Sequence, residues 1–317
     1  MTAVRVVVVV SSPRTPAGCL TWPAWRALQA GPVLHGPGSP HLPALVAAGV
    51  VLEPLATDAA LVMERALADG RATWLAGPDG DPVLVRELGL RSARTTGVEL
   101  EVVFGSHDLP GSRLLDVVAV MDRLRSPGGC PWDADQTHTS LMPYLLEEAY
   151  EAYEALETGD GPALREELGD VLLQIAFHAR IATDWDVDDV AGDLVDKLVR
   201  RHPHVFADAA VDDLEASWTA IKQAEKRRTS VTDGVPMGQP ALALARKLQS
   251  RGARLGAPVP SYDGIGGELW ALVARCRAEG VDPEQALREV ARAYRDTLAE
   301  LELDPPATAQ QWEQRWS

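Results

Sequence analysis

Short apolar runs alternate with amphipathic stretches over the first hundred residues. Mainly apolar runs of this length, bounded by turn residues, are typical of buried strands, and the longer periodic stretches are typical of helices. The predicted strands are Val4–Val10, Val50–Leu55, Thr73–Ala76 and Val98–Phe104, and the predicted helices are Trp22–Gln29, His41–Ala48 and Ala59–Ala68. This alternation predicts an α/β domain with a parallel sheet over residues 1–107.

Glycine and proline interrupt this domain, most densely in Gly77-Pro78-Asp79-Gly80-Asp81-Pro82. That segment could be a ligand loop, but a plain turn between a strand and a helix is the favoured interpretation. The domain weakly resembles part of a tetrapyrrole-methylase-like, S-adenosylmethionine-binding fold, a partial Rossmann arrangement. It is too short to be a complete one, so we predict no methyl transfer and assign no role to residues 1–107.

Helical periodicity replaces the strand pattern from Gly111 onward. The predicted helices are Leu114–Leu124, Ser140–Leu156, Ala163–Thr183, Asp188–Arg201 and Asp212–Arg228. The stretch Ser126–Thr139, which has two glycines and two prolines in its first half, is predicted to be a loop. We therefore expect an all-α bundle over residues 108–232.

The last part of the chain, residues 233–317, is also predicted to be helical. Its candidate segments are Pro240–Leu255, Gly267–Glu279, Pro283–Leu301 and Pro306–Trp316.

Two of the predicted bundle helices carry carboxylates on one face each. At about 100° per residue, Glu147, Glu151 and Glu154 share a face of the first helix, and Glu148 lies beside them. The second helix begins after the break at Thr158–Pro162. So short a break makes the two helices antiparallel neighbours, and their carboxylates can point into one shared gap.

On the second helix, Glu167 and Asp170 stand at positions i and i+3, again on one face. Carboxylates that share a gap repel and raise the pKa of one another, and a divalent cation relieves that repulsion. A ligand set made only of oxygen suits Mg²⁺ or Mn²⁺. The alternative is a solvated acidic face, but the apolar sequence around Asp170 favours a partly buried position and a metal site.

Composition limits the classes of partner. The chain has 317 residues, a net charge of −16 and a pI near 4.8, so a nucleic-acid polymer is not an expected ligand. The three cysteines form no CxxC pair, which argues against a thiolate zinc site and fits a reducing compartment. The apolar run Val4–Val10 is too short to span a membrane or to form a signal-peptide core. We expect a soluble cytoplasmic protein.

Four sequence blocks stand in order along the central part of the chain. The first is LRSPGGCPWDADQTHTSLMPYLL at Leu124–Leu146. The second is Glu147-Glu148-x-x-Glu151, followed after fifteen intervening residues by Glu167-x-x-Asp170. The third and fourth are LVRRHPHVF at Leu198–Phe206 and Trp218-x-x-Ile221-Lys222-x-x-Glu225-Lys226. Together they resemble the MazG family of nucleoside triphosphate pyrophosphohydrolases, in the all-α NTP pyrophosphatase superfamily. The EExxE motif alone is common on acidic helices, whereas the four blocks at these spacings are specific.

The resemblance implies an all-α bundle that splits nucleoside triphosphates into monophosphate and pyrophosphate. It implies a magnesium site, with manganese as a substitute, formed by Glu147, Glu148, Glu151, Glu167 and Asp170. By the same matching of positions, Trp218 and Lys222 lie near the nucleotide, and Arg200 or Arg201 reaches phosphate. Our hypothesis for the general base is Glu148, with Lys222 assisting the departure of pyrophosphate.

Several other residues have a structural and a functional interpretation. Trp132 could anchor its loop or close over substrate, and both interpretations stay open. We interpret His202 and His204 as part of a helix end rather than a metal pair. His178 is expected in the core, and Cys130 is interpreted as structural because no histidine arrangement would activate it. Glu154 is expected at the rim of the acidic site.

The tail resembles a shortened second copy of the same domain. At the positions that correspond to Glu167 and Asp170, the alignment places Gly264 and Gly267, which have no side chain to bind a metal. No EExxE motif precedes them. We therefore expect one active site per chain, in the central domain.

The predicted function is Mg²⁺-dependent hydrolysis of nucleoside triphosphates to monophosphate and pyrophosphate, in the removal of non-canonical or oxidised nucleotides. The apolar helices are too many for one small bundle to bury, so a homodimer or larger homo-oligomer is expected. The alternatives are a nucleotide-binding regulator without turnover, a scaffold with merely solvated acidic helices, and a methyltransferase.

Overall fold

The computed structural model describes residues 3–207 and 230–303. The chain divides into two compact units, residues 1–194 and 195–317. The first unit contains a parallel sheet and a set of helices, and the described part of the second unit is helical.

The sheet of the first unit has five parallel strands in the order β3-β2-β4-β1-β5. The strands are β1 (Val4–Val10), β2 (Val33–His35), β3 (Leu52–Pro54), β4 (Arg71–Leu75) and β5 (Val98–Phe104). Register pairs Val8 of β1 with Trp74 of β4 on one side and with Val102 of β5 on the other. The predicted α/β class and its parallel sheet are confirmed.

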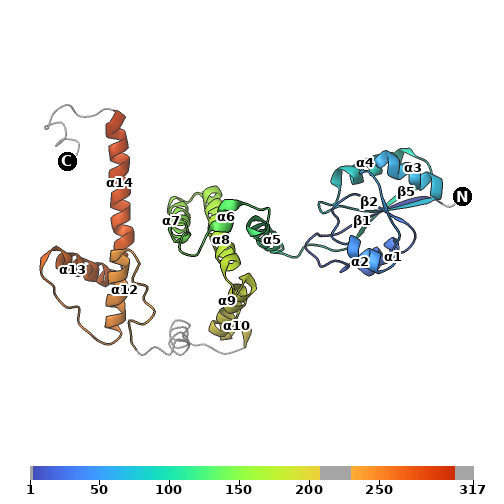
Figure 1. The fold of residues 1–317 in the computed structure, drawn as a ribbon. Coiled ribbons are helices and arrows are strands. Elements are labelled where there is room, and N and C mark those ends of the chain that lie inside the picture. The colour runs from blue at the N-terminus through green and yellow to red at the C-terminus, as the bar shows by residue number, and fades with distance from the viewer. Residues whose placement is uncertain (1–2, 208–229, 304–317) are drawn as a thin grey trace. The chain divides into compact units, whose positions relative to one another are not determined.

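Four helices cover the two faces of this sheet (Figure 1). They are α1 (Trp22–Leu28), α2 (Leu42–Ala47), α3 (Ala59–Asp69) and α4 (Pro82–Arg94). Successive side chains of a strand point to opposite faces. Accordingly, Val6 and Val8 pack with α3 and α4, whereas Val7 and Val9 pack with α1 and α2. Because both faces are buried, β1 is almost entirely valine.

Two elements of the sheet domain were absent from the sequence-based prediction, namely β2 and α4. Strand β2 has only three residues, too few to show a period. The predicted strand Val50–Leu55 is confirmed in position, but the observed strand β3 is shorter and spans only Leu52–Pro54. The segment that follows β4 is a turn, as favoured: the Asp81 carboxylate accepts hydrogen bonds from Trp74 Nε1 at 2.8 Å and from Gly77 N at 3.0 Å. These contacts tie the loop to its own strand.

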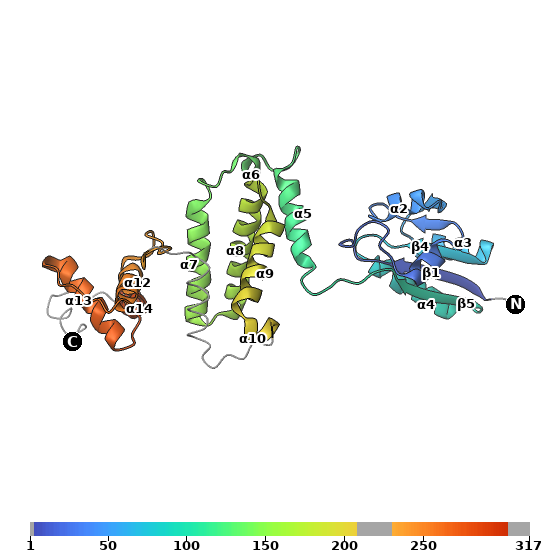
Figure 2. The same cartoon turned by 90° about the horizontal axis from the view of Figure 1, so that it is seen from below.

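The remaining helices of the first unit are α5 (Arg113–Arg125), α6 (Pro131–Asp135), α7 (Met142–Thr158), α8 (Gly161–Ile181) and the start of α9 (Val187–Arg201). Figure 2 shows α7 and α8 side by side along their lengths, with α5 on the other side of α8. The prediction of a loop over Ser126–Thr139 is wrong in part. Pro131 begins a short helix there, which suits a residue with a fixed φ and no N–H.

Local sequence explains the hairpin between α7 and α8. Gly159 ends α7 in the left-handed conformation, at φ 72°, which glycine adopts without a steric penalty. Asp160 then caps α8, because its carboxylate accepts a hydrogen bond from Ala163 N at 3.0 Å. Ala152 and Ala155 are buried in α7, and such small side chains allow a neighbouring helix to approach closely.

The described part of the second unit contains the end of α9 and four further helices. These are α10 (Pro203–Phe206), α12 (Ala241–Ala253), α13 (Gly264–Ala278) and α14 (Pro283–Leu303). The predicted helices Asp212–Arg228 and Pro306–Trp316 lie outside the described residues. Within residues 3–207 and 230–303, no helix is long and apolar enough to cross a membrane.

The two glycines that the sequence alignment places opposite Glu167 and Asp170 have a role in the backbone of the tail. Gly264 has φ 77°, a conformation that disfavours other residues. A Cβ atom on Gly267 would lie 1.8 Å from the carbonyl oxygen of Tyr262, so a side chain there would force the backbone to move. An aspartate or glutamate could not replace either glycine without strain.

Candidate functional site

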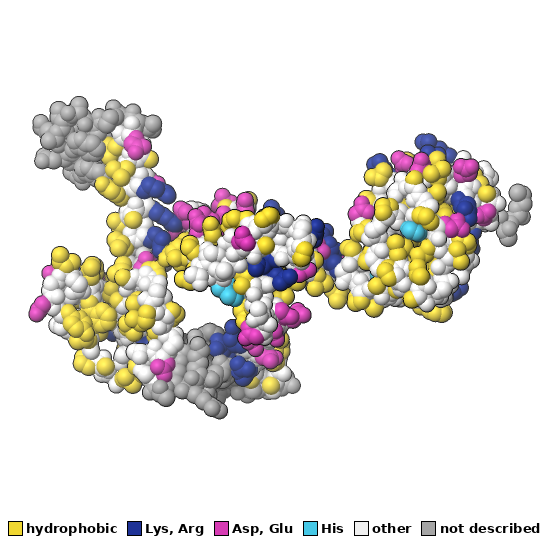
Figure 3. Space-filling model, in the orientation of Figure 1, with side chains coloured by type: hydrophobic (Ala, Val, Ile, Leu, Met, Phe, Trp, Pro, Cys, Tyr) yellow, Lys and Arg dark blue, Asp and Glu magenta, His cyan; other side chains and the backbone are white. Residues whose placement is uncertain are grey.

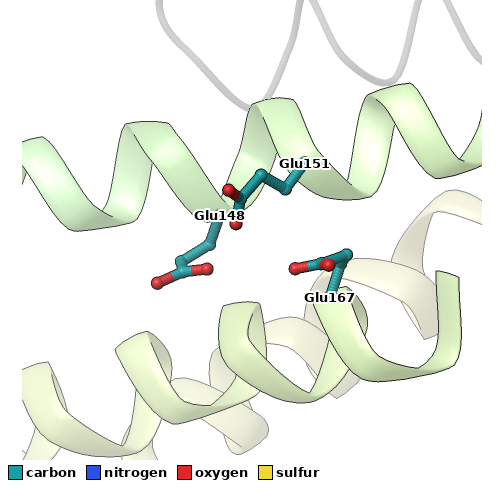
Figure 4. Close-up of side chains that lie close together, drawn as sticks. All are labelled: Glu148, Glu151 and Glu167. Atoms are coloured by element: carbon teal, nitrogen blue, oxygen red, sulfur yellow. The ribbon is translucent and has the colours of Figure 1, made fainter. Parts of the chain in front are cut away.

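Three carboxylates meet between α7 and α8. Glu148 and Glu151 come from α7 and Glu167 comes from α8, and one oxygen of each lies within 4.8 Å of the others. Figure 4 shows the three side chains entering the gap between the two helices. The spacing follows from the sequence, because residues i and i+3 lie on one helix face and the tight hairpin brings the second helix alongside.

The electrostatics of this group are those of crowded like charges. Burial raises the pKa of Glu148, and the charges of Asp170, Glu151 and Glu147 raise it further. Burial also raises the pKa of Glu167, with contributions from Glu151 and Asp170. Both side chains are partly buried, so water screens the repulsion only in part. Such a site favours a ligand that brings positive charge.

The other two predicted metal ligands lie outside the group of three. Glu147 is exposed and Asp170 is half-buried. Their charges still act on Glu148, so both belong to the same electronegative region. Glu154 is exposed on α7, as the prediction of a rim position requires.

The segment between α5 and α7 packs on the C-terminal half of α8. The Trp132 ring meets Phe177 edge-on at 6.4 Å between centroids, and meets Tyr144 of α7 in the same manner at 6.2 Å. Arg125 donates a hydrogen bond to the carbonyl oxygen of Asp133, and its guanidinium lies over the Phe177 ring. Trp132 is nevertheless 53% exposed, so it is anchored by its edge and keeps a surface that is open to a ligand.

A pair of histidines fixes the end of this segment. His138 Nδ1 lies 2.8 Å from His178 Nδ1, and the planes of the two rings are 8° apart. One ring must donate its proton and the other accept it. Burial lowers the pKa of His178, and His138 lowers it further. The prediction of a core position for His178 is wrong in this respect: the side chain is half-buried and has a partner forty residues away.

The basic and aromatic residues predicted near the nucleotide are only partly described. Arg200 is exposed and Arg201 half-buried at the end of α9, and each has a polar partner. Trp218 and Lys222 lie outside the described residues. The interpretation of His202 as part of a helix end is supported, since its Nδ1 lies 2.7 Å from Leu198 O.

Comparison with known proteins identifies the α7–α10 region. The MazG nucleotide pyrophosphohydrolase domain matches residues 136–206, which include all three clustered carboxylates. A Streptomyces cacaoi protein, described as the 26.1 kDa protein in the blaB 3′ region, is 51% identical over 242 residues. That match covers 72% of this chain and 99% of the relative.

Several relatives have enzymatic names. The nucleoside triphosphate pyrophosphohydrolase of Mycolicibacterium smegmatis is 44% identical, over 61% of this chain and 60% of that protein. The nucleoside triphosphate pyrophosphohydrolase/pyrophosphatase MazG of Thermotoga maritima is 36% identical, over 59% of this chain and 84% of that protein. The chain therefore spans about three-fifths of the mycobacterial relative and most of the other two. The chain belongs to the MazG family of nucleoside triphosphate pyrophosphohydrolases.

Proposed function

We propose that the α7–α8 hairpin hydrolyses nucleoside triphosphates to nucleoside monophosphate and pyrophosphate, by attack of water on the α-phosphate. The observation that carries this proposal is the convergence of Glu148, Glu151 and Glu167 inside the segment that matches the MazG domain. Three carboxylates alone would repel a triphosphate, so the proposal needs a cation between them.

The donor set fits a divalent cation. Oxygens from both helices lie within 4.8 Å of one another, and burial and mutual repulsion raise the pKa of Glu148 and Glu167. Glu147 and Asp170 complete the proposed ligand set. When bound, Mg²⁺ or Mn²⁺ would neutralise the charge of the triphosphate and acidify a water molecule.

The side chains of the protein are proposed to position the metal and the substrate and to take a proton from the attacking water. Glu148 is the proposed proton acceptor for the attacking water, since its half-buried carboxylate points into the same gap as the other proposed ligands. Glu151 and Glu167 face each other across the hairpin and would keep the metal at a fixed place. Arg200, Arg201 and Lys222 are proposed to bind phosphate and the departing pyrophosphate, and Trp132 and Trp218 to contact the nucleoside.

A panel of canonical and oxidised NTPs and dNTPs tests the function. With Mg²⁺, we expect equal amounts of monophosphate and pyrophosphate, and no turnover after chelation of the metal. Preference for oxidised or non-canonical triphosphates would support a role in cleansing the nucleotide pool. Saturable nucleotide binding without any product would instead favour the alternative, a regulatory nucleotide-binding protein.

We also propose that the chain forms a homodimer or larger homo-oligomer. Met142, Leu146, Leu156 and Leu168 are each more than half exposed on the hairpin. Figure 3 shows such hydrophobic side chains on the surface, together with acidic ones, over the α7 and α8 region. Sedimentation equilibrium at micromolar concentration should give at least twice the mass of one chain. A monomer under these conditions would contradict the proposal.

The boundaries at residues 107 and 232 stay predictions, as does the partial Rossmann or tetrapyrrole-methylase-like character of the sheet. The proposed single active site per chain is supported by the tail, where Gly264 and Gly267 stand at the positions aligned with the carboxylates.

Cytoplasmic location is part of the proposal, because nucleoside triphosphates are made and used there.

A further inference from the structure

A buried glutamine without a hydrogen-bond partner lies on α8, beyond the acidic group. Gln174 is only 4% exposed, and its Oε1 atom has no partner among the described residues. A buried polar group left unpaired costs about 1–3 kcal/mol, so an apolar residue would be more stable at this position. Gln249, equally buried on α12, also has an unpaired Oε1, but its amide is held in place because its Nε2 donates a hydrogen bond to Trp270 O at 2.9 Å.

The helical spacing places Gln174 in line with the acidic group. It follows Asp170 by four residues, so it stands about one turn, or 6 Å, further along the helix and about 40° round it. It lies about 20° round the helix from Glu167. Because Glu167 faces α7, Gln174 lies on the side of α8 that faces α7.

The direction from the acidic group to Gln174 leads to the exposed aromatic residues. Since α7 and α8 are antiparallel, the part of α7 beside Gln174 precedes Glu148, where Tyr144 lies. Tyr144 contacts Trp132, and Trp132 contacts Phe177 of α8. Tyr144 and Trp132 are 41% and 53% exposed.

A nucleotide has its pentose directly after the α-phosphate and its base beyond the pentose. If the α-phosphate is held beside Asp170, at the end of the proposed ligand set nearest to Gln174, the nucleoside begins about 6 Å away along the helix, whereas Glu167 lies about 10 Å from Gln174. We infer that the Gln174 amide hydrogen-bonds the nucleoside part of the substrate, whose base lies toward Trp132 and Tyr144. This inference rests on the proposed function, and it makes Gln174 a specificity residue rather than a metal ligand.

Gln174→Met tests the inference, because methionine has nearly the same length and cannot form the hydrogen bond. We expect kcat/KM for nucleoside triphosphates to fall about five- to tenfold, mainly through KM, as loss of one hydrogen bond requires. Inhibition by tripolyphosphate with Mg²⁺ should be unchanged, because that ligand has no nucleoside. The melting temperature without ligand should be equal or higher, since an unpaired buried amide is removed. Gln174→Asn keeps an amide on a side chain that is one methylene shorter, so it should lose the same contact.

Substrates that lack one group locate the contact. If the fall in kcat/KM caused by Gln174→Met disappears with a 2′- or 3′-deoxy substrate, Gln174 binds the pentose. If the fall persists with these substrates and differs between purine and pyrimidine nucleotides, Gln174 binds the base. Gln249→Met is the matched control and should leave all substrate ratios unchanged. Equal weakening of nucleotide and tripolyphosphate, or no change with any nucleotide, would overturn the inference.

The failure of the inference can be told from failure of the proposed function. If the wild-type protein releases no pyrophosphate, the function is wrong, and calorimetry then compares binding of a nucleoside triphosphate with that of tripolyphosphate. A five- to tenfold loss for the nucleotide alone in Gln174→Met would still support the contact. Equal binding of the nucleotide by wild type and variant would refute it.

Discussion

Replacement of Glu167 or Asp170 by alanine should reduce pyrophosphate release by about 10²- to 10⁴-fold, because a bound metal contributes several kcal/mol to transition-state stabilisation. Glu167 is the residue of α8 that meets both carboxylates of α7, so its removal leaves no ligand from α8 in the group of three. Asp170 lies near enough to raise the pKa of Glu148 and completes the proposed set. Steady-state kinetics with saturating Mg²⁺ and a competent triphosphate would measure the loss.

Glu166→Gln is the matched control. Glu166 is adjacent to Glu167 on α8 but is exposed and outside the group of three. The charge of Glu166 contributes to the raised pKa of Glu167, but Glu166 is not a proposed metal ligand, so Glu166→Gln should retain activity within about twofold. If Glu167→Ala and Asp170→Ala both kept full hydrolysis, the proposal of one active site per chain in the central domain would be wrong.

Glu148→Gln should lower kcat by about 10²- to 10⁴-fold, the usual contribution of a general base. Glutamine keeps the shape of the side chain and an oxygen for the metal, but it cannot accept the proton of water. We therefore expect a large effect on kcat and a smaller one on the affinity for Mg²⁺, measured by calorimetry. Loss of Mg²⁺ binding with an equal loss of activity would instead make Glu148 a ligand only.

Although Glu148→Gln should lower kcat, we expect it to raise the stability of the metal-free protein. Because the pKa of Glu148 is raised in the folded state, folding favours its protonated form. Stability is therefore lost as the pH rises from the ordinary pKa of a glutamate through the raised one. At pH 7, metal-free Glu148→Gln should melt at a higher temperature than the wild type, and the difference should vanish in acid.

Glu154→Gln separates this local effect from a general reduction of negative charge. Glu154 is on the same helix, exposed and outside the group of three. It should change neither kcat nor the pH dependence of stability appreciably. A rise in melting temperature equal to that of Glu148→Gln would indicate relief of the net charge of −16 rather than of the crowded site.

The hairpin that carries the site could be predicted because its signals are local. Each end of α7 and α8 lies within two residues of the boundaries Ser140–Leu156 and Ala163–Thr183. Gly159 and Asp160 are strong end and start signals for helices, and they stand next to each other. With the hairpin fixed, the i and i+3 spacing alone brings the carboxylates of both helices together.

Features that depend on distant partners could not be predicted from spacing. The contact of His138 with His178 joins residues forty positions apart, so neither sequence neighbourhood reveals it. Strand β2 is only three residues long and is defined by pairing with β3 and β4. Gln174 is similar: its sequence context is an ordinary apolar helix, and only its burial without a partner distinguishes it.

Hydrolysis in ¹⁸O-labelled water, with both products analysed by mass spectrometry, tests the proposed chemistry most directly. Attack on the α-phosphate places one ¹⁸O atom in the nucleoside monophosphate and none in pyrophosphate, and this should hold for every triphosphate that is turned over with Mg²⁺. Label in pyrophosphate would show attack on the β-phosphate. That result would contradict the proposed attack on the α-phosphate. Orthophosphate in place of pyrophosphate would show stepwise removal of phosphate, and would contradict the assignment of the α7–α8 carboxylates to a pyrophosphohydrolase site.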